Sequence, residues 1–205
     1  ISTQFTNTSI GAVTSDWDFG DGNTSTQTNP SYTYSAAGTY VVTLTVSAGS
    51  CTDVITQNIT VNPLPVADFT STPACPNANT QFNDISTVSS GTITGWDWTF
   101  TSATPTSSTL QNPSTVYSVG GNYNATLIVT TNNGCTDTVT LGFIIPFSPV
   151  ADFTSIPECL GNPICFTDIS TVTNSTITGW SWDFTDGSPL DLTQNPCHNF
   201  AAAGS

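Results

Sequence analysis

The stretch "SDWDFGDGNTSTQTNPSYTYSAAGTYVVTLTV", residues 15–46, decides the fold of this chain. From residue 40 to residue 46 its side chains alternate, with Tyr, Val, Leu and Val on one face and Val, Thr and Thr on the other. A period of two residues is typical of a half-buried β-strand. The first half of the stretch places Asp16, Asp18 and Asp21 close together among aromatic residues and glycines. These acids could form a chemical site or a turn of the scaffold.

The composition of the chain excludes several classes of partner. Only 7% of the 205 residues are charged, with 14 acids, one His and no Lys or Arg, which gives a formal charge of -14. Nucleic acids and anionic membrane surfaces are bound through clusters of Lys and Arg, so we expect neither as a partner. The hydrophobic residues, 37% of the chain, are patterned, which predicts a folded chain. This stretch has no apolar run of about 18 residues and no charged-then-apolar leader, so we expect no membrane insertion in this segment; a leader, where the protein has one, lies upstream.

The frame of the opening stretch occurs three times along the chain. Each copy carries a three-residue motif that begins with Trp and ends with Phe, which we call the aromatic triplet. Each copy also has an Asn-Pro pair and a further aromatic residue four positions after the Pro. The triplets are Trp17–Phe19, Trp98–Phe100 and Trp182–Phe184, the pairs begin at Asn29, Asn112 and Asn195, and the further aromatics are Tyr34, Tyr117 and Phe200. The copies span residues 1–62, 63–147 and 148–205. Short strands separated by Gly, Pro, Asn and Asp turns predict an all-β, antiparallel sandwich for each copy.

Only the second copy holds every expected strand. The sequence VADFTS, which begins at Val66 and again at Val150, has no counterpart in the first copy. The third copy stops before the strands that correspond to residues 40–46 and 52–61. We therefore expect residues 63–147 to form a self-sufficient domain. The other two copies are expected to belong to a longer continuous array, or to be completed by strands from a neighbouring chain.

The frame W-D-F-G-D-G, then N-P-x-x-x-Y, then G-T-Y-x-V-x-L-x-V resembles the polycystic-kidney-disease (PKD) domain, an immunoglobulin-like sandwich. The second copy departs from the family pattern with "WTFTSATP", and the third with "WDFTDG". The resemblance implies tandem immunoglobulin-like, PKD-type sandwiches arranged head to tail. The positions of the cysteines are similar to those of very large surface adhesins of gliding and predatory bacteria, which are exported by a type IX secretion route.

The acids of the opening stretch have a scaffold interpretation and a metal interpretation. The first and third residues of each aromatic triplet share one strand face, so six residues are predicted to be core: Trp17, Phe19, Trp98, Phe100, Trp182 and Phe184. Asp18 then points outward and Asp21 forms a turn with Gly22. The alternative is a calcium site, for which the candidates are Asp18, Asp21, Asp183 and Asp186. The second copy has Thr99, Ser102 and Ala103 in this region, so the scaffold interpretation is favoured and no cofactor is expected.

Catalytic groups are scarce in this chain. It has no Lys for Schiff-base chemistry and no Arg to clamp an oxyanion, and its acids form no glycosidase-type pair that recurs among the copies. His198 lies beside Cys197, and a Cys-His nucleophile pair is one interpretation. However, Cys165 and Cys197 both belong to the third copy alone and lie on strands that should be neighbours, so we predict a disulfide between them. We expect no enzyme and no turnover of peptide, glycoside or ester substrates.

The other four cysteines fall on two repeating sites, with Cys75 and Cys159 before the second strand and Cys51 and Cys135 after the sixth. Six cysteines without a C-x-x-C pair indicate an oxidising, extracellular compartment rather than zinc. In an immunoglobulin-like topology the two sites lie at opposite poles, about seven strand residues apart at roughly 3.3 Å each, beyond disulfide reach. We therefore expect bonds between modules or to residues outside this sequence, such as an upstream partner for Cys135. A Cys75–Cys135 bond is the alternative.

These features favour a structural or adhesive segment of a long secreted cell-surface protein, forming a stalk, fibre or tether. Pro63, Pro65, Pro146 and Pro149 would stiffen the joints, and the absence of Lys and Arg removes every trypsin-type cleavage site. The expected partners are adjacent repeats, identical chains in a fibre or bundle, and a ligand on a cell, prey or host surface. The alternative is an accessory carbohydrate- or protein-binding module of a secreted hydrolase. Such a module needs an exposed aromatic platform, but Trp96 and Trp180 share the core face and are expected to be buried.

Overall fold

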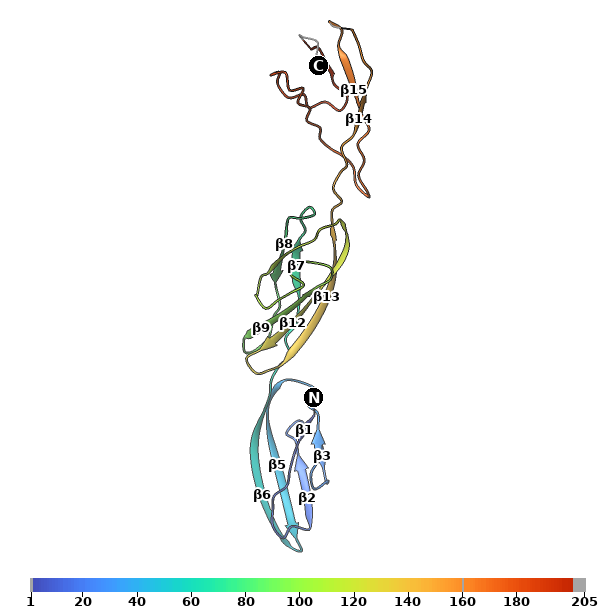
Figure 1. Cartoon of the computed structure of the whole chain (residues 1–205). Helices are drawn as coiled ribbons and strands as arrows, with labels where there is room; N and C mark the ends of the chain where they lie inside the picture. The colour runs from blue at the N-terminus through green and yellow to red at the C-terminus, as the bar shows by residue number, and fades with distance from the viewer. Residues whose placement is uncertain (1, 160, 201–205) are drawn as a thin grey trace. The chain divides into compact units, whose positions relative to one another are not determined.

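The structure is a computed structural model that describes residues 2–159 and 161–200 (Figure 1). Every regular element in these residues is a β-strand, and the paired strands are antiparallel wherever their register is defined. The predicted all-β fold is therefore confirmed. None of the described residues belongs to a helix that is long and apolar enough to cross a membrane.

The first repeat has two sheets. Its strands are β1 (Thr3–Gln4), β2 (Thr14–Asp18), β3 (Thr24–Ser25), β4 (Ser31–Tyr32), β5 (Gly38–Ala48) and β6 (Cys51–Val61). The larger sheet has the order β3-β2-β5-β6, and β1 pairs with β4 in the smaller one. The β5–β6 hairpin pairs along its whole length, from Gly38 with Val61 to Ala48 with Cys51. The alternation read from residues 40–46 thus belongs to a central strand.

The core of the first repeat lies between these sheets. It consists of Phe5, Trp17, Phe19, Tyr34, Val42 and Leu44. Phe5 reaches both aromatic rings of the triplet, with its ring centroid 5.5 Å from that of Trp17 and 5.3 Å from that of Phe19. Large aromatic side chains contribute most of the apolar area that such a small sandwich buries. The triplet therefore holds the two sheets together.

The second repeat has the strands β7 (Phe69–Thr72), β8 (Asn79–Asp84), β9 (Ile93–Phe100), β10 (Ser107–Ser108), β11 (Ser114–Val116), β12 (Gly121–Thr131) and β13 (Thr136–Ile145). Its sheets have the orders β10-β9-β12-β13 and β11-β8-β7. Trp98 and Phe100 are 1% exposed and Phe82 is 0% exposed, as the strand pattern predicts. The ring centroids of Trp98 and Phe100 lie 5.7 Å and 4.8 Å from that of Phe82.

In the third repeat, β14 (Phe153–Ser155), β15 (Ile164–Asp168) and β16 (Cys197–His198) form one sheet. Trp182 and Phe184 were predicted to be core residues, but here they are only half-buried. Phe153 is 53% exposed, whereas its counterpart Phe69 is 4% exposed. The reason is that no second sheet covers these rings among the described residues of this repeat. The structure therefore corrects the core assignment for these two aromatics.

Candidate functional site

A glutamine side chain ties the second strand of the sandwich to the Asn-Pro turn. In the first repeat, Gln4 Nε2 donates to the carbonyl oxygens of Asn29 (3.1 Å) and Pro30 (3.2 Å). In the second repeat, Gln81 makes the same two bonds to its own Asn-Pro pair, at 3.2 and 3.0 Å. We call this arrangement the glutamine clamp. The glutamine clamp is not among the features predicted from the sequence, although Gln stands directly before a core Phe in two copies.

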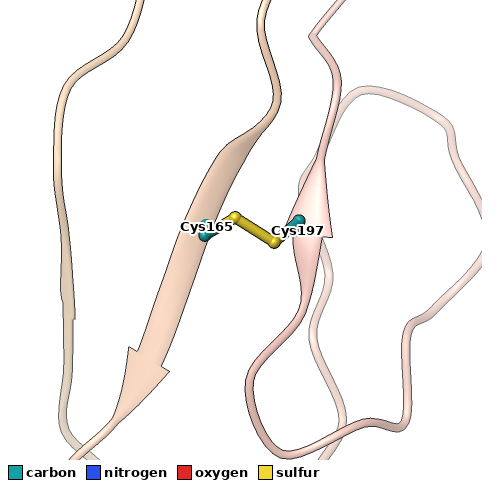
Figure 2. Close-up of a disulfide and its surroundings, with 2 residues drawn as sticks. All are labelled: Cys165 and Cys197. Atoms are coloured by element: carbon teal, nitrogen blue, oxygen red, sulfur yellow. A yellow bond between two sulfur atoms is a disulfide. The ribbon is translucent and has the colours of Figure 1, made fainter.

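In the third repeat a disulfide occupies the place of the glutamine clamp. Gln4 and Gln81 each lie opposite a serine in the strand register, and at the same two positions the third repeat pairs Cys165 with Cys197. The structure joins these two sulfur atoms at 2.03 Å, with the Cα atoms 4.0 Å apart (Figure 2). This is the disulfide that the sequence predicts. A covalent bond here holds together the strands that two amide hydrogen bonds hold elsewhere.

The asparagine of each Asn-Pro pair adds a second tie to the same strand. Its side-chain oxygen accepts a backbone N–H just after the core Phe in all three repeats. The bonds run from Asn7 to Asn29 (2.8 Å), from Asp84 to Asn112 (2.9 Å) and from Asp168 to Asn195 (2.8 Å). The pair thus combines a proline of fixed φ with an acceptor for the neighbouring backbone. This explains why Asn-Pro persists where the surrounding residues change.

The acidic turn of the first repeat is closed by its own carboxylates. Asp18 Oδ1 accepts the N–H of Gly20 at 2.9 Å, and Asp21 Oδ1 accepts that of Asn23 at 3.1 Å. Asp21 Oδ2 accepts the hydroxyl of Tyr32 at 2.7 Å, and this bond holds the pKa of Asp21 below its ordinary value. Among the residues that the structure describes, no group of three or more His, Cys, Asp or Glu side chains could hold a metal ion. In this fold the carboxylates order a turn.

The third repeat builds the same turn with different residues. Asp183 Oδ1 accepts the N–H of Thr185 at 2.9 Å, and Asp186 Oδ1 accepts that of Ser188 at 3.0 Å. Asp186 Oδ2 lies 2.7 Å from His198 Nε2. The hydrogen bonds from Ser188 and His198 lower the pKa of Asp186. The calcium candidates of this repeat are therefore also engaged in closing the turn.

His198 occupies the position of Tyr32 in the turn. Its ring stacks on Phe184 at 4.1 Å and 7°, as the Tyr32 ring stacks on Phe19 at 4.0 Å and 5°. Because the sulfur of Cys197 is bonded to Cys165, the adjacent His198 has no free thiol to activate. The geometry gives His198 the role that a tyrosine has in the first repeat, which is to stack on an aromatic ring and bond an aspartate.

The second repeat closes this region without an acid. Thr115 on β11 occupies the position that Tyr32 and His198 have in the other repeats. Its hydroxyl donates a hydrogen bond to the carbonyl oxygen of Pro105 at 2.7 Å. The turn itself contains Ser102, with φ of 59°, in place of the acid-glycine pair. Three sets of side chains thus perform one structural task. Chemistry that requires a carboxylate at this turn would be absent from one repeat in three.

The remaining cysteines carry free thiols in the structure. Cys51, Cys75 and Cys159 are exposed and Cys135 is half-buried. Cys51 and Cys135 lie at the β5–β6 and β12–β13 hairpins, whereas Cys75 and Cys159 lie in the loops after β7 and β14. The alternative Cys75–Cys135 bond is not formed here. The expected bonds between modules stay a prediction.

Trp96 and Trp180, which were expected to be buried, are half-buried. The Trp180 indole N–H donates to Asp168 Oδ2 at 2.8 Å, and Gln194 Nε2 donates to the same oxygen at 3.2 Å. Hydrogen bonds from Ser170 are the main cause that lowers the pKa of Asp168 to about 2, and the bonds from Trp180 and Gln194 add to it. The alternation that ends at Trp98 and Trp182 predicts burial of both indoles, but both are only partly covered, and Trp180 does not lie on a strand.

Comparison with known proteins identifies the repeat. A family model described as the PKD domain matches residues 1–61 and 62–145. The chain belongs to the PKD domain family. Among solved structures, it is similar to the PKD1 domain of Vibrio anguillarum Epp, with 25% identity over 43% of this chain and 100% of that chain and a TM-score of 0.39. It is also similar to the PKD1 domain of the Vibrio cholerae metalloprotease PrtV, with 28% identity over 40% and 96% of the two chains and a TM-score of 0.36.

Membership in the PKD family and the disulfide together indicate an extracellular structural or binding module. Tandem repetition of the PKD frame, predicted from the aromatic triplets, is confirmed for the first two copies by the two matched ranges. The third copy shares their triplet and its Asn-Pro tie.

Acidification from about pH 5 to about pH 2 will loosen the third repeat. Asp168 and Asp186 have folded-state pKa values below the ordinary value near 3.8, so both are ionised when folded. The stability they contribute is present above about pH 4 and is lost as the pH falls through the folded pKa, about 2 for Asp168. The indole resonance of Trp180, followed by NMR against pH, measures this change. In Asp168→Asn the indole resonance should no longer change with pH over this range. The same pH dependence in that variant as in the native chain would contradict the role given to Asp168.

Proposed function

We propose that this chain is a structural, stalk-forming segment of a secreted cell-surface protein, in which PKD repeats hold an adhesive part away from the cell. The observation that carries the proposal is the shortness of the joints. In each joint, the last residue anchored to one repeat and the first residue anchored to the next are separated by four residues or fewer.

The first joint runs between Val61 and Val66. Val61 ends β6, where it pairs with Gly38. Val66 makes two backbone hydrogen bonds with Thr87, at 2.7 and 3.0 Å, and the next N–H, of Ala67, donates to Asp137 Oδ2 at 2.8 Å. Only residues 62–65 lie between these anchors, and two of them are prolines. Prolines restrict the backbone and make a linker stiff.

The second joint is shorter still. Val150 makes the same pair of backbone bonds with Thr171, at 2.8 and 3.0 Å. At the other end, the backbone of Pro146 and Phe147 lies directly against Gly120. A Cβ atom on Gly120 would lie 2.7 Å from the Cα of Phe147 and 2.8 Å from the carbonyl oxygen of Pro146. Only residues 148 and 149 remain between the anchors, which supports a joint with little freedom.

The composition supports the same function. A surface stalk is exposed to proteases, and a chain without Lys or Arg offers no site to enzymes that cleave after cations. The proposal includes that the whole protein is exported to the cell surface, is anchored there and carries an adhesive part.

Replacing Gly120 with Ala tests the joint. We expect the added methyl to push residues 146–147 off the second repeat, because backbone atoms closer than about 3 Å to a Cβ cannot be accommodated without movement. Small-angle scattering of the full chain should then show a broader distribution of dimensions, and amide exchange at the non-proline residues of 145–150 should rise at least tenfold. Gly179→Ala is the matched control, because no atom lies within 4 Å of its Cβ position. A stiff stalk would be refuted if the parent chain already showed a broad distribution of dimensions and both the Gly120→Ala and Gly179→Ala variants gave the same scattering as the parent.

A further inference from the structure

A shallow hollow lies on the third repeat beside Trp180. It has a volume of about 480 Å³, and side chains with hydroxyl, amide, carboxylate and indole groups line it. The ones that matter here are Asp168, Thr171, Ser175, Thr176, Trp180 and Gln194. We call it the Trp180 hollow. Ser175 and Thr176 are exposed at its rim, and the half-buried indole forms part of its wall.

The indole in this wall is held in one orientation. The indole N–H donates to Asp168 Oδ2 at 2.8 Å. Asp168 is itself fixed by two further donors, because Gln194 Nε2 donates to Oδ2 at 3.2 Å and the backbone N–H of Ser170 donates to Oδ1 at 3.0 Å. A side chain fixed in this way loses little rotamer freedom when a ligand packs on it. The wall is therefore a preorganised aromatic surface rather than a mobile side chain.

The three residues of this network behave as a unit across the repeats. The second repeat has the same residue types at the matching positions, Asp84, Trp96 and Gln111, and Gln111 Nε2 donates to Asp84 Oδ2 at 3.2 Å. The first repeat has changed all three, to Asn7, Ser15 and Thr28.

The sandwich of the first repeat stands without the Asp-Trp-Gln network. There, Asn7 Nδ2 donates to Ser15 Oγ at 2.8 Å, and Ser15 is 7% exposed. Since two small polar groups can close this end of the repeat, closing it does not require a tryptophan. The Asp, Trp and Gln that the other two repeats share at these positions call for a further role.

The chemistry of the hollow selects one class of ligand. A pyranose ring has an apolar face of C–H groups, which packs on an indole, and a rim of hydroxyls, which pair with Ser, Thr, Gln and carboxylate groups. Asp168 is already bonded to Trp180, Gln194 and Ser170, so the hydroxyls of Thr171, Ser175 and Thr176 are the groups offered to the sugar. With no Lys or Arg in the chain, an acidic sugar would meet only negative charge. The ligand class is therefore a neutral sugar.

We propose that the Trp180 hollow binds a ring of a neutral polysaccharide, and that Trp96 marks an equivalent contact on the second repeat. This binding goes beyond the stalk function, since a stalk needs no ligand along its length. Two contacts on consecutive repeats would raise the avidity of the chain for a polymer over that of either contact alone.

Native gels containing a soluble neutral polysaccharide test the proposal with the full chain. A protein with a charge of -14 migrates fast, whereas the neutral polymer does not migrate, so binding retards the band. The probes are mixed-linkage β-glucan, galactomannan and arabinoxylan. We expect retardation by at least one of them, and an affinity at least tenfold lower for Trp180→Ala combined with Trp96→Ala.

Two further variants separate binding from folding. Thr176→Glu places a carboxylate in the hollow from an exposed position, so it should weaken binding at least tenfold without altering the melting temperature. Leu190→Ala is the matched control, because this leucine is 57% exposed, belongs to the same repeat and does not line the hollow. The proposal is overturned if none of the three polymers retards the native chain, or if Thr176→Glu and the double tryptophan variant bind as the native chain does.

Discussion

Reduction of the Cys165–Cys197 disulfide is expected to destabilise the third repeat by about 3–4 kcal/mol. The bond closes a loop with a sequence separation of 32 residues. Cross-linking a loop of this size removes about that much conformational entropy from the unfolded chain. The repeat has half-buried aromatics in place of a closed core, so it has little stability in reserve. Amide exchange of β15 in the full chain, with and without dithiothreitol, measures the loss.

A variant that restores the glutamine clamp is the sharpest control for this prediction. Cys165→Gln with Cys197→Ser gives the third repeat the residue pair found at Gln4 and Ser31. Two regained hydrogen bonds, at about 0.5–1.5 kcal/mol each, should recover part of the loss, whereas Cys165→Ala with Cys197→Ala should recover none. Equal protection of β15 in the oxidised chain, the reduced chain and the double-alanine variant would show that the bond does not hold these strands.

Gly20→Ala is expected to destabilise the first repeat by about 3 kcal/mol, a large part of the stability of a small domain. Gly20 has φ of +79°, where an alanine costs about 1–2 kcal/mol. A Cβ atom would also lie 2.6 Å from the carbonyl oxygen and 2.9 Å from the nitrogen of Val41 on β5. Both are backbone atoms of a central strand, so they cannot move aside as a side chain would. Amide exchange of β5 in the full chain measures the effect.

Gly22 provides the matched control two residues away. Its φ is +92°, but nothing lies within 4 Å of its Cβ position, so Gly22→Ala should cost only the backbone contribution of about 1–2 kcal/mol. If both variants lose the same stability, contact with Val41 has no part in the effect. The third repeat illustrates the difference, because Thr185 stands at the place of Gly20 with φ of 59°. No strand equivalent to β5 lies beside it among the described residues of that repeat.

The strands and most of the core were predictable because they depend on local periodicity. Alternation over residues 40–46 marked β5, and the spacing of Trp98 and Phe100 placed both on one buried face. Burial itself depends on what covers that face. The same alternation in the third repeat therefore overstated the burial of Trp182, and likewise that of Trp180.

The ties between segments were harder to predict, because their partners are distant in sequence. The partner of Asp21 is Tyr32 on β4, and the glutamine clamp joins residues that are 25 or more positions apart. A polar residue on a short strand gives no sign of where its side chain will bond. Only the paired cysteines revealed such a tie in advance, because two unusual residues in one copy suggest one another.

The disulfide also has a mechanical consequence. When tension is applied across the third repeat, the covalent bond carries it directly from Cys165 to Cys197, so the residues between them bear none of the load. That loop would otherwise lengthen by about 100 Å, at roughly 3.3–3.6 Å per residue, once the repeat is pulled open. The acidic turn and the ring of Trp182 lie inside this shielded loop. Under a steady pull, the third repeat therefore lengthens less when it unfolds. The residues between Cys165 and Cys197, which include the acidic turn, stay unstretched after the strands around them have separated.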